Sequence, residues 1–251
     1  MKIVIIGYGN MGHQIEKIVE SKGFELVSTI DPAQNAKFKQ ITKESLKDAE
    51  VCIDFTIPGS AIDNIRKIAK LRKNIVIGTT GWYDKLSEAR KIVKSNNIGL
   101  IYGSNFSIGV NVFYRMVENA SKLMNKLDHY DVFGYEIHHN RKIDSPSGTA
   151  KYLGSILLNN IKRKKSLLYD KIDRKINRDE LHFASVRAGF IPGTHVIGFD
   201  SGADTIELKH TARNREGFAL GAVMAAQWIK GKKGFYCVED MVKDMLGDNN
   251  V

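Results

Sequence analysis

The chain has 251 residues, 43% of them hydrophobic and 26% charged, which is typical of a folded globular protein that buries a core. The formal net charge of +10 would suit a nucleic-acid-binding protein, but no nucleic-acid-binding motif accompanies it, so we expect a solvated lysine-rich surface and no nucleic-acid partner. We expect a cytoplasmic protein without a membrane partner, because no apolar run could span a bilayer, no signal peptide is evident, and Cys52 and Cys237 form no disulfide or metal framework.

Strand and helix patterns alternate over the first hundred residues. Short apolar runs that end near glycine or aspartate predict strands, and apolar residues at helical spacing predict the helices between them. This alternation predicts an α/β fold, a Rossmann-type doubly wound parallel sheet with helices on both faces. The expected strands are 2–6, 24–30, 51–55, 74–77 and 98–102, and the expected helices are 11–21, 60–71 and 86–93.

The pattern changes after about residue 106. One long amphipathic helix is expected over 110–127, a strand over 130–138 and a second helix over 147–161. Strand patterns over 181–188, 195–199 and 205–210 then follow one another without helices between them. This order predicts a second, α+β domain built on a mostly antiparallel sheet, before a last helix over 217–229.

A glycine-rich loop directly follows the first strand and opens the first helix. In this context the first glycine allows a tight turn, the second lets the backbone approach a pyrophosphate, and the third lets helix and strand pack closely. Asp31 ends the second strand, where a carboxylate can accept hydrogen bonds from the adenosine ribose. The alternative is an ordinary glycine turn in a fold that binds no nucleotide, in which Asp31 merely caps a loop. The loop residues expected to bind a dinucleotide are Gly7, Tyr8, Gly9, Asn10, Met11 and Gly12.

Two further segments follow the fourth and fifth predicted strands. Ligands of open α/β sheets lie at the carboxyl ends of the strands, so both segments are candidates to contact the nicotinamide end of the cofactor. The alternative for each is an ordinary turn. The candidate residues are Gly78, Thr79 and Thr80 in the first segment and Gly103, Ser104, Asn105 and Phe106 in the second.

The segment from Glu136 to Ala150 is the richest in chemistry. Pro146 disfavours helix in the residue before it, and Ser147 is a good N-cap, so a helix is expected to begin here. Ser147, Gly148 and Thr149 would present backbone amides and two hydroxyls at a helix N-terminus, which suits an anion such as a carboxylate.

Four basic side chains approach this anion site: His138, His139, Arg141 and Lys142. Clustered cations lower one another's proton affinity, so a lysine here could donate a proton, and histidine is the other natural proton carrier. The alternative is a solvated polar loop. We expect no metal, because adjacent histidines on a strand point to opposite faces and no acid is obviously grouped with them.

The run His138 to Ala150 matches every specified position of H-H-x-x-K-x-D-x-P-S-G-T-A, and it resembles the signature of the 4-hydroxy-tetrahydrodipicolinate reductase family, formerly dihydrodipicolinate reductase. The resemblance continues in the family's order along essentially the whole chain. It implies a homotetramer that reduces a cyclic imine dicarboxylate to tetrahydrodipicolinate with NADH or NADPH, in the lysine and diaminopimelate pathway. It also implies that residues 1–106 and 215–251 form the dinucleotide-binding domain and 107–214 the substrate-binding and oligomerisation domain.

By the same resemblance, His138 is expected to be a proton donor or acceptor and Lys142 the proton donor. His139 is expected to contact the substrate, and the amides of Gly148 and Thr149 to hold one of its carboxylates. The glycine loop, Asp31 and the two segments after the fourth and fifth strands are expected to contact the cofactor.

One departure from the family concerns the glycine loop. The family often has a longer loop with an arginine just before the methionine, whereas Asn10 stands before Met11 here. Asp31 is followed by Pro32 and not by a basic residue, so recognition of the NADPH 2′-phosphate would need Lys37 or Lys39. We therefore expect NADH to be used at least as well as NADPH.

Two other kinds of protein remain as alternatives. A related amino-acid or diaminopimelate dehydrogenase would share the nucleotide domain but lacks the complete run from His138 to Ala150. A nucleotide-sensing regulator without catalysis would need neither His138 nor Lys142.

Overall fold

A computed structural model describes residues 1–247 and divides the chain into two compact units. The first unit contains Met1–Ile108 and the segment from Arg215 onward, and the second contains Gly109–Asn214. The expected dinucleotide-binding domain extends to residue 251, and residues 248–251 lie outside the described part. No described helix is long and apolar enough to cross a bilayer.

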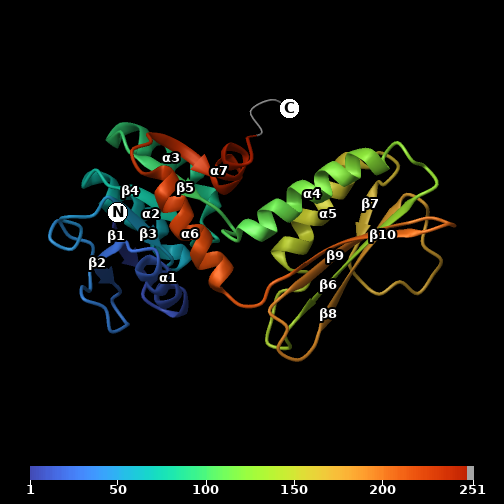
Figure 1. Ribbon diagram of the computed structural model, residues 1–251, viewed down its shortest axis with the longest axis horizontal. Helices are drawn as coiled ribbons and strands as arrows, with labels where there is room; N and C mark the ends of the chain where they lie inside the picture. The colour runs from blue at the N-terminus through green and yellow to red at the C-terminus, as the bar shows by residue number, and fades with distance from the viewer. Residues whose placement is uncertain (248–251) are drawn as a thin grey trace. The chain divides into compact units, whose positions relative to one another are not determined.

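A six-stranded sheet in the order β11-β5-β4-β3-β1-β2 is the centre of the first unit, and every pairing in it is parallel. Helices cover both faces, as Figure 1 shows, and the expected Rossmann-type fold is confirmed. The strands are β1 (Lys2–Ile6), β2 (Glu25–Ile30), β3 (Val51–Asp54), β4 (Asn74–Ile77), β5 (Gly99–Tyr102) and β11 (Gly234–Cys237). The helices are α1 (Asn10–Ser21), α2 (Pro58–Lys70), α3 (Leu86–Asn96), α6 (Glu216–Ile229) and α7 (Val238–Met245), with a single 3-10 turn at Tyr83–Lys85.

The side chains of β1 alternate between two cores, one on each face of the sheet. Ile3 and Ile5 pack in a core with α1, α6 and α7, whereas Val4 and Ile6 pack in a second core with α2 and α3. Side chains of successive strand residues point to opposite faces, so a strand covered on both sides needs an unbroken apolar run. The apolar run of β1 meets that requirement.

The second unit contains a five-stranded sheet in the order β10-β9-β6-β8-β7. Two helices, α4 and α5, lie along one face of it (Figure 1) and share a core with β6, β8 and β9. The strands are β6 (Asp131–His138), β7 (Ser166–Leu168), β8 (Glu180–Arg187), β9 (Thr194–Asp200) and β10 (Thr205–Thr211), and the helices are α4 (Ile108–Met124) and α5 (Gly148–Asn160).

The pairing in this second sheet is mixed. The expected antiparallel order holds for β6, β9 and β10, but β8 joins β6 in parallel and β7 joins β8 in parallel. The reason lies in the connections: the crossover through α5 returns the chain so that β7 runs in the same direction as β6, and the long loop 169–179 returns it again before β8. The "mostly antiparallel" expectation therefore becomes a mixed sheet within the predicted α+β domain.

Candidate active site

Each glycine of the loop between β1 and α1 has its own structural reason. Gly7 has a φ of +87°, and a Cβ there would lie 2.2 Å from the carbonyl oxygen of Phe55. A Cβ on Gly12 would lie 2.4 Å from the carbonyl oxygen of Gly7, so this glycine permits the close approach of helix to strand. A Cβ on Gly9 would have nothing within 4 Å. The loop is therefore tightly packed at Gly7 and Gly12 and open at Gly9, where a ligand's phosphates would approach.

The N-terminus of α1 lies at the open part of this loop. Gly9 is the N-cap residue, no described side chain caps the helix, and its first turn contains no acidic residue. Backbone amides at such an end carry a partial positive charge and suit a phosphate. The Tyr8 side chain lies over α1 instead, where its hydroxyl donates to Glu16 (2.5 Å) and its ring contacts His13.

Asp31 caps the loop that follows β2, as the structural alternative to a ribose contact predicts, and it also holds the glycine loop. Its Oδ2 accepts a hydrogen bond from the Tyr8 amide (2.8 Å), and its Oδ1 accepts from the amides of Ala33 (2.8 Å) and Gln34 (3.0 Å). Burial alone would raise the pKa of this carboxyl, but the three amide hydrogen bonds outweigh it and hold the pKa below its usual value. Asp31 is therefore an anion that connects the end of β2 to the glycine loop through hydrogen bonds. The hydroxyls of a bound ribose would donate to the same carboxylate as these amides.

The segment after β4 combines one exposed and two enclosed candidates. Thr79 is buried, and its hydroxyl donates to Asp54 (2.9 Å), whereas Thr80 is exposed. A Cβ on Gly78 would lie 2.1 Å from the Phe55 ring, so this glycine is needed for packing. Of the expected contacts here, the Thr80 side chain alone faces outward, and Gly78 and Thr79 can offer only backbone groups.

The segment after β5 shows the same division. Ser104 is exposed, but Phe106 is 2% exposed and packs in the core beside α6. A Cβ on Gly103 would lie 2.8 Å from Val238 of α7. The Asn105 side chain accepts a hydrogen bond from the Ser107 amide (2.9 Å) and so shapes the entry into α4.

Asp54, at the end of β3, is a functional candidate that the sequence analysis missed. It is fully buried and accepts hydrogen bonds from Thr56, Asn64 and Thr79. Burial raises the pKa of this carboxyl, although those hydrogen bonds oppose the change. Asp54 thus links the loops that follow β3 and β4, and both loops lie at the carboxyl edge of the sheet beside the β1 loop, where the strand order reverses.

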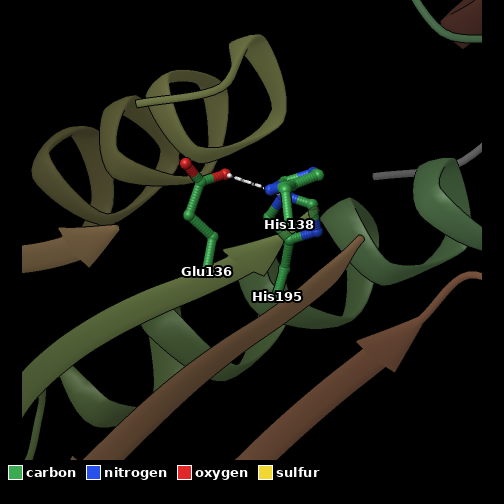
Figure 2. A group of neighbouring side chains, drawn as sticks. All are labelled: Glu136, His138 and His195. Atoms are coloured by element: carbon green, nitrogen blue, oxygen red, sulfur yellow. Dashed lines mark ion pairs between the residues drawn. The ribbon is translucent and has the colours of Figure 1, made fainter. Parts of the chain in front are cut away.

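The second unit gathers its polar residues around Glu136 on the helix-covered face of the sheet. Glu136 and His138 are two residues apart on β6 and therefore point to the same face. Register places His195 of β9 beside Glu136, and Arg187 of β8 beside His138. Figure 2 shows the two histidine rings directed toward the Glu136 carboxylate.

Glu136 is completely buried and surrounded by donors. Its Oε1 accepts from the Ser147 amide (2.9 Å), Ser185 Oγ (2.9 Å) and Arg187 (2.8 Å), and its Oε2 accepts from Ser147 Oγ. His195 Nε2 lies 3.3 Å from Oε2. Burial raises the pKa of Glu136, but the contacts with His195, Ser147 and Arg187 more than offset it and lower the pKa well below the ordinary value.

His138 is neutral near pH 7. Burial is the largest effect and lowers its pKa from 6.5 to about 4, with His195, Lys142 and Arg187 acting in the same direction against Glu136. The 3.3 Å approach of His138 Nδ1 to Glu136 Oε2 is consequently a contact between a neutral ring and a carboxylate. Nδ1 is buried and has no aligned hydrogen-bond partner among the described residues.

An acid, Glu136, is grouped with His138 after all, contrary to the expectation from the sequence. Glu136, His138 and His195 place one ligand atom each within 4.8 Å of one another. The acid was missed because it precedes the histidine pair by two residues and meets His195 only through strand pairing. The absence of a metal stays a prediction, now for a different reason. Arg187 brings a positive charge to the Glu136 carboxylate, and the Ser147 amide and hydroxyl donate hydrogen bonds to it, so its oxygens already have partners.

Ser147 caps α5 as expected, because its hydroxyl accepts from the Ala150 amide (3.1 Å). The expectation that its amide and hydroxyl are free for a ligand was wrong, since both donate to Glu136. Gly148 is exposed and Thr149 half-buried, and their amides have no hydrogen-bond partner among residues 1–247. The groups left for the expected anion site at the start of α5 are thus these two amides and the Thr149 hydroxyl.

Lys142 lies in the loop between β6 and α5 and is held by Asp144, with 2.6 Å between Nζ and Oδ1. This ion pair places an anion beside Lys142 in addition to the cationic neighbours expected from the sequence. The amide of His139 donates to the carbonyl of Ile191 (2.7 Å), which joins this loop to the one between β8 and β9. Arg141 is exposed and lies over the Phe190 ring.

Comparison with known proteins agrees with this arrangement over both units. Residues 1–106 match the family model of the dihydrodipicolinate reductase N-terminus, and residues 109–242 match that of its C-terminus. The 4-hydroxy-tetrahydrodipicolinate reductase of Christiangramia forsetii is 39% identical over 98% of this chain and 99% of its own length. The enzyme of the same name from Methanoculleus marisnigri is 34% identical over 96% and 99%.

Solved structures show the same fold at greater distance. A dipicolinate-bound dihydrodipicolinate reductase from Paenisporosarcina sp. TG-14 has a TM-score of 0.78 at 24% identity, covering 96% of this chain and 99% of that one. A DAP dehydrogenase from C. glutamicum has a TM-score of 0.52 at 13% identity, covering 100% and 99%, so the rival class shares the architecture but is much less similar in sequence. The chain therefore belongs to the dihydrodipicolinate reductase family of oxidoreductases.

Proposed function

We propose that this protein reduces the cyclic imine dicarboxylate 4-hydroxy-tetrahydrodipicolinate, or its dehydrated form, to tetrahydrodipicolinate in lysine and diaminopimelate biosynthesis. The observation that carries the proposal is the pair of amides at Gly148 and Thr149, which have no hydrogen-bond partner among the described residues and lie close in sequence to Lys142 and His138 within one loop–helix segment. This segment offers both a carboxylate anchor and a proton donor, which a reducible dicarboxylate needs. Support comes from relatives that carry this name over nearly the full chain.

A reduced nicotinamide cofactor fits the first unit. The open face of Gly9, the uncapped N-terminus of α1 and the anionic Asp31 would hold its pyrophosphate and adenosine ribose, and the exposed Thr80 and Ser104 are the side chains available to its other end. When bound, the cofactor supplies the hydride.

The second unit positions the substrate and supplies the proton. The amides of Gly148 and Thr149 hold one substrate carboxylate, and His139 contacts the ring's polar groups. Reduction leaves an electron-rich ring atom, and the Lys142 ammonium, steadied by Asp144, donates a proton to it. His138 is neutral and therefore acts as a hydrogen-bond partner and not as a cationic acid.

NADH is the cofactor that we expect to be used at least as well as NADPH. The Asp31 carboxylate is held as an anion and repels a 2′-phosphate, and Asn10 brings no positive charge to the loop. Lys39 is the nearest basic candidate, but its Nζ is bonded to the Gln34 carbonyl (2.6 Å). Recognition of the NADPH 2′-phosphate would need Lys37 or Lys39 to turn toward it.

A homotetramer built through the second unit's sheet is the assembly that we propose, and a cytoplasmic location is proposed with it. On the sheet face away from α4 and α5, Phe133, Tyr135 and Ile137 of β6 are only half-buried and Val186 of β8 is 45% exposed. An apolar sheet face of this kind is usually covered by a partner. Light scattering at micromolar concentration should report a mass near four times 28.1 kDa, and a monomer would contradict the proposal.

A coupled assay tests the proposed activity. Aspartate semialdehyde, pyruvate and a purified dihydrodipicolinate synthase generate the unstable substrate, and NADH absorbance is followed after this protein is added. We expect NADH loss only when every component is present. Folded protein that consumes neither NADH nor NADPH would show that the assignment is wrong.

A further inference from the structure

The buried Glu136 carboxylate approaches one edge of the His138 ring. Glu136 is 0% exposed, and His138 is 7% exposed with Nδ1 3.3 Å from Glu136 Oε2. The neighbouring Arg187 and Ser147 keep the carboxylate anionic and fixed in place. A carboxylate at this distance can accept a hydrogen bond from Nδ1–H but offers nothing to a bare Nδ1 lone pair.

The opposite edge of the same ring is kept open. His138 Nε2 is not among the buried polar atoms without a partner, and it has no hydrogen bond within residues 1–247, so it is reached by solvent. Gly193 faces it, and a Cβ at that position would lie 2.9 Å from Nε2. The glycine therefore leaves this nitrogen uncovered on the side away from Glu136.

We propose that Glu136 is a positioning residue that holds His138 in its Nδ1–H tautomer, so that the Nε2 lone pair faces outward to accept a hydrogen bond from a proton-bearing group of the substrate. Hydrogen bonding at one ring nitrogen sets which nitrogen carries the proton, and carboxylates fix histidines in this way in many sites. The Nδ1–Oε2 contact is not aligned as a hydrogen bond, but a carboxylate 3.3 Å away still favours a proton on the nitrogen that faces it. The catalytic meaning of the tautomer depends on the proposed function, but the tautomer itself does not.

Nitrogen NMR of the ligand-free protein tests the tautomer directly. Protein labelled with ¹⁵N-histidine distinguishes protonated from bare ring nitrogens, and His138→Gln identifies the His138 signals by their loss. We expect Nδ1 protonated and Nε2 bare at pH 7.5, with Glu136→Gln shifting the ring toward the other tautomer. A wild-type ring protonated at Nε2 would overturn the proposal even if Glu136→Gln does not fold, and so would a folded Glu136→Gln protein with an unchanged ring.

Glu180→Gln is the matched control. Like Glu136, Glu180 is a buried carboxylate paired with an arginine, in this case Arg174. Glu180 lies at the start of β8, whereas Glu136 of β6 pairs with Ser185 near the end of β8. This variant should leave the His138 signals and kcat unchanged. A change in the His138 signals equal to that in Glu136→Gln would mean that the tautomer responds to general loss of buried charge, against the proposal.

Kinetics with a double variant separate a positioning role from a structural one. Glu136→Gln should lower kcat by about 10–100-fold, as loss of such outer partners typically does, while the NADH dissociation constant stays unchanged. If Glu136 acts through His138, adding Glu136→Gln to His138→Gln should cause little further loss. Losses that multiply would contradict the proposal. Absence of activity in the wild type would refute the proposed function but would leave the NMR result standing.

Discussion

Acidification should destabilise this protein through His138 by an amount that follows from its pKa. The folded-state pKa is about 4 and the ordinary value is 6.5. Between these values the unfolded chain binds more protons than the folded chain, so stability rises with pH across this window and falls as pH is lowered through it. Integrating from pH 8 to pH 5 gives a loss of about 2 kcal/mol for this one residue, and its 7% exposure leaves little solvent screening to reduce it.

His138→Gln removes this titration. Urea unfolding at pH 8 and pH 5, at a fixed protomer concentration, should show the variant losing about 2 kcal/mol less stability than wild type between the two values. The comparison uses the difference between two pH values, so a general destabilisation by the substitution cancels. His129→Gln, at a side chain that is 62% exposed, should lose as much as wild type. Equal losses in His138→Gln and wild type would refute the neutral, buried state of this ring.

Lys142→Met should lower kcat by about 10²–10⁴-fold with little change in the NADH dissociation constant, because it removes the proton donor and leaves the glycine loop intact; near-normal kcat with chemistry rate-limiting would end that assignment. Thr149→Val should mainly raise the substrate KM, by a factor equivalent to about 0.5–3 kcal/mol, and a kcat effect alone would move the carboxylate elsewhere. Gly12→Ala should abolish NADH binding in a fluorescence titration, because its Cβ would lie 2.4 Å from the Gly7 carbonyl oxygen; wild-type affinity would show that the loop can move. A kcat/KM ratio favouring NADPH by more than about tenfold, roughly 1.4 kcal/mol, would show that the charge of Asp31 is overcome.

The glycine loop and the cap of α5 could be predicted because both are local. Three glycines and a following helix specify a tight strand-to-helix turn within six residues, and Ser147 follows a proline that disfavours helix before it. The structure adds what each residue contacts. Thus Gly9 is open, whereas the Ser147 amide and hydroxyl are both taken by Glu136.

Other features depend on contacts between distant segments. Glu136 meets His195 and Arg187 only because three strands pair in one register, and sequence spacing holds no information on that register. The same limit hid the contact between Asp31 and the Tyr8 amide, as well as the parallel pairing of β8 with β6. Strand β11 (Gly234–Cys237) was not predicted from the sequence. Its four residues are too few to show the alternation of apolar and polar side chains that indicates a strand.

Deuteride transfer tests the central claim most directly. NADH that carries deuterium at the transferable C4 position is incubated with the synthase product and this protein, and the ring product is analysed by mass spectrometry. The proposed function predicts tetrahydrodipicolinate one mass unit heavier than the product from ordinary NADH, with labelled product formed about 10²–10⁴-fold more slowly when Lys142→Met replaces the wild type. Unlabelled product, or label found only in water, would contradict reduction by direct hydride transfer.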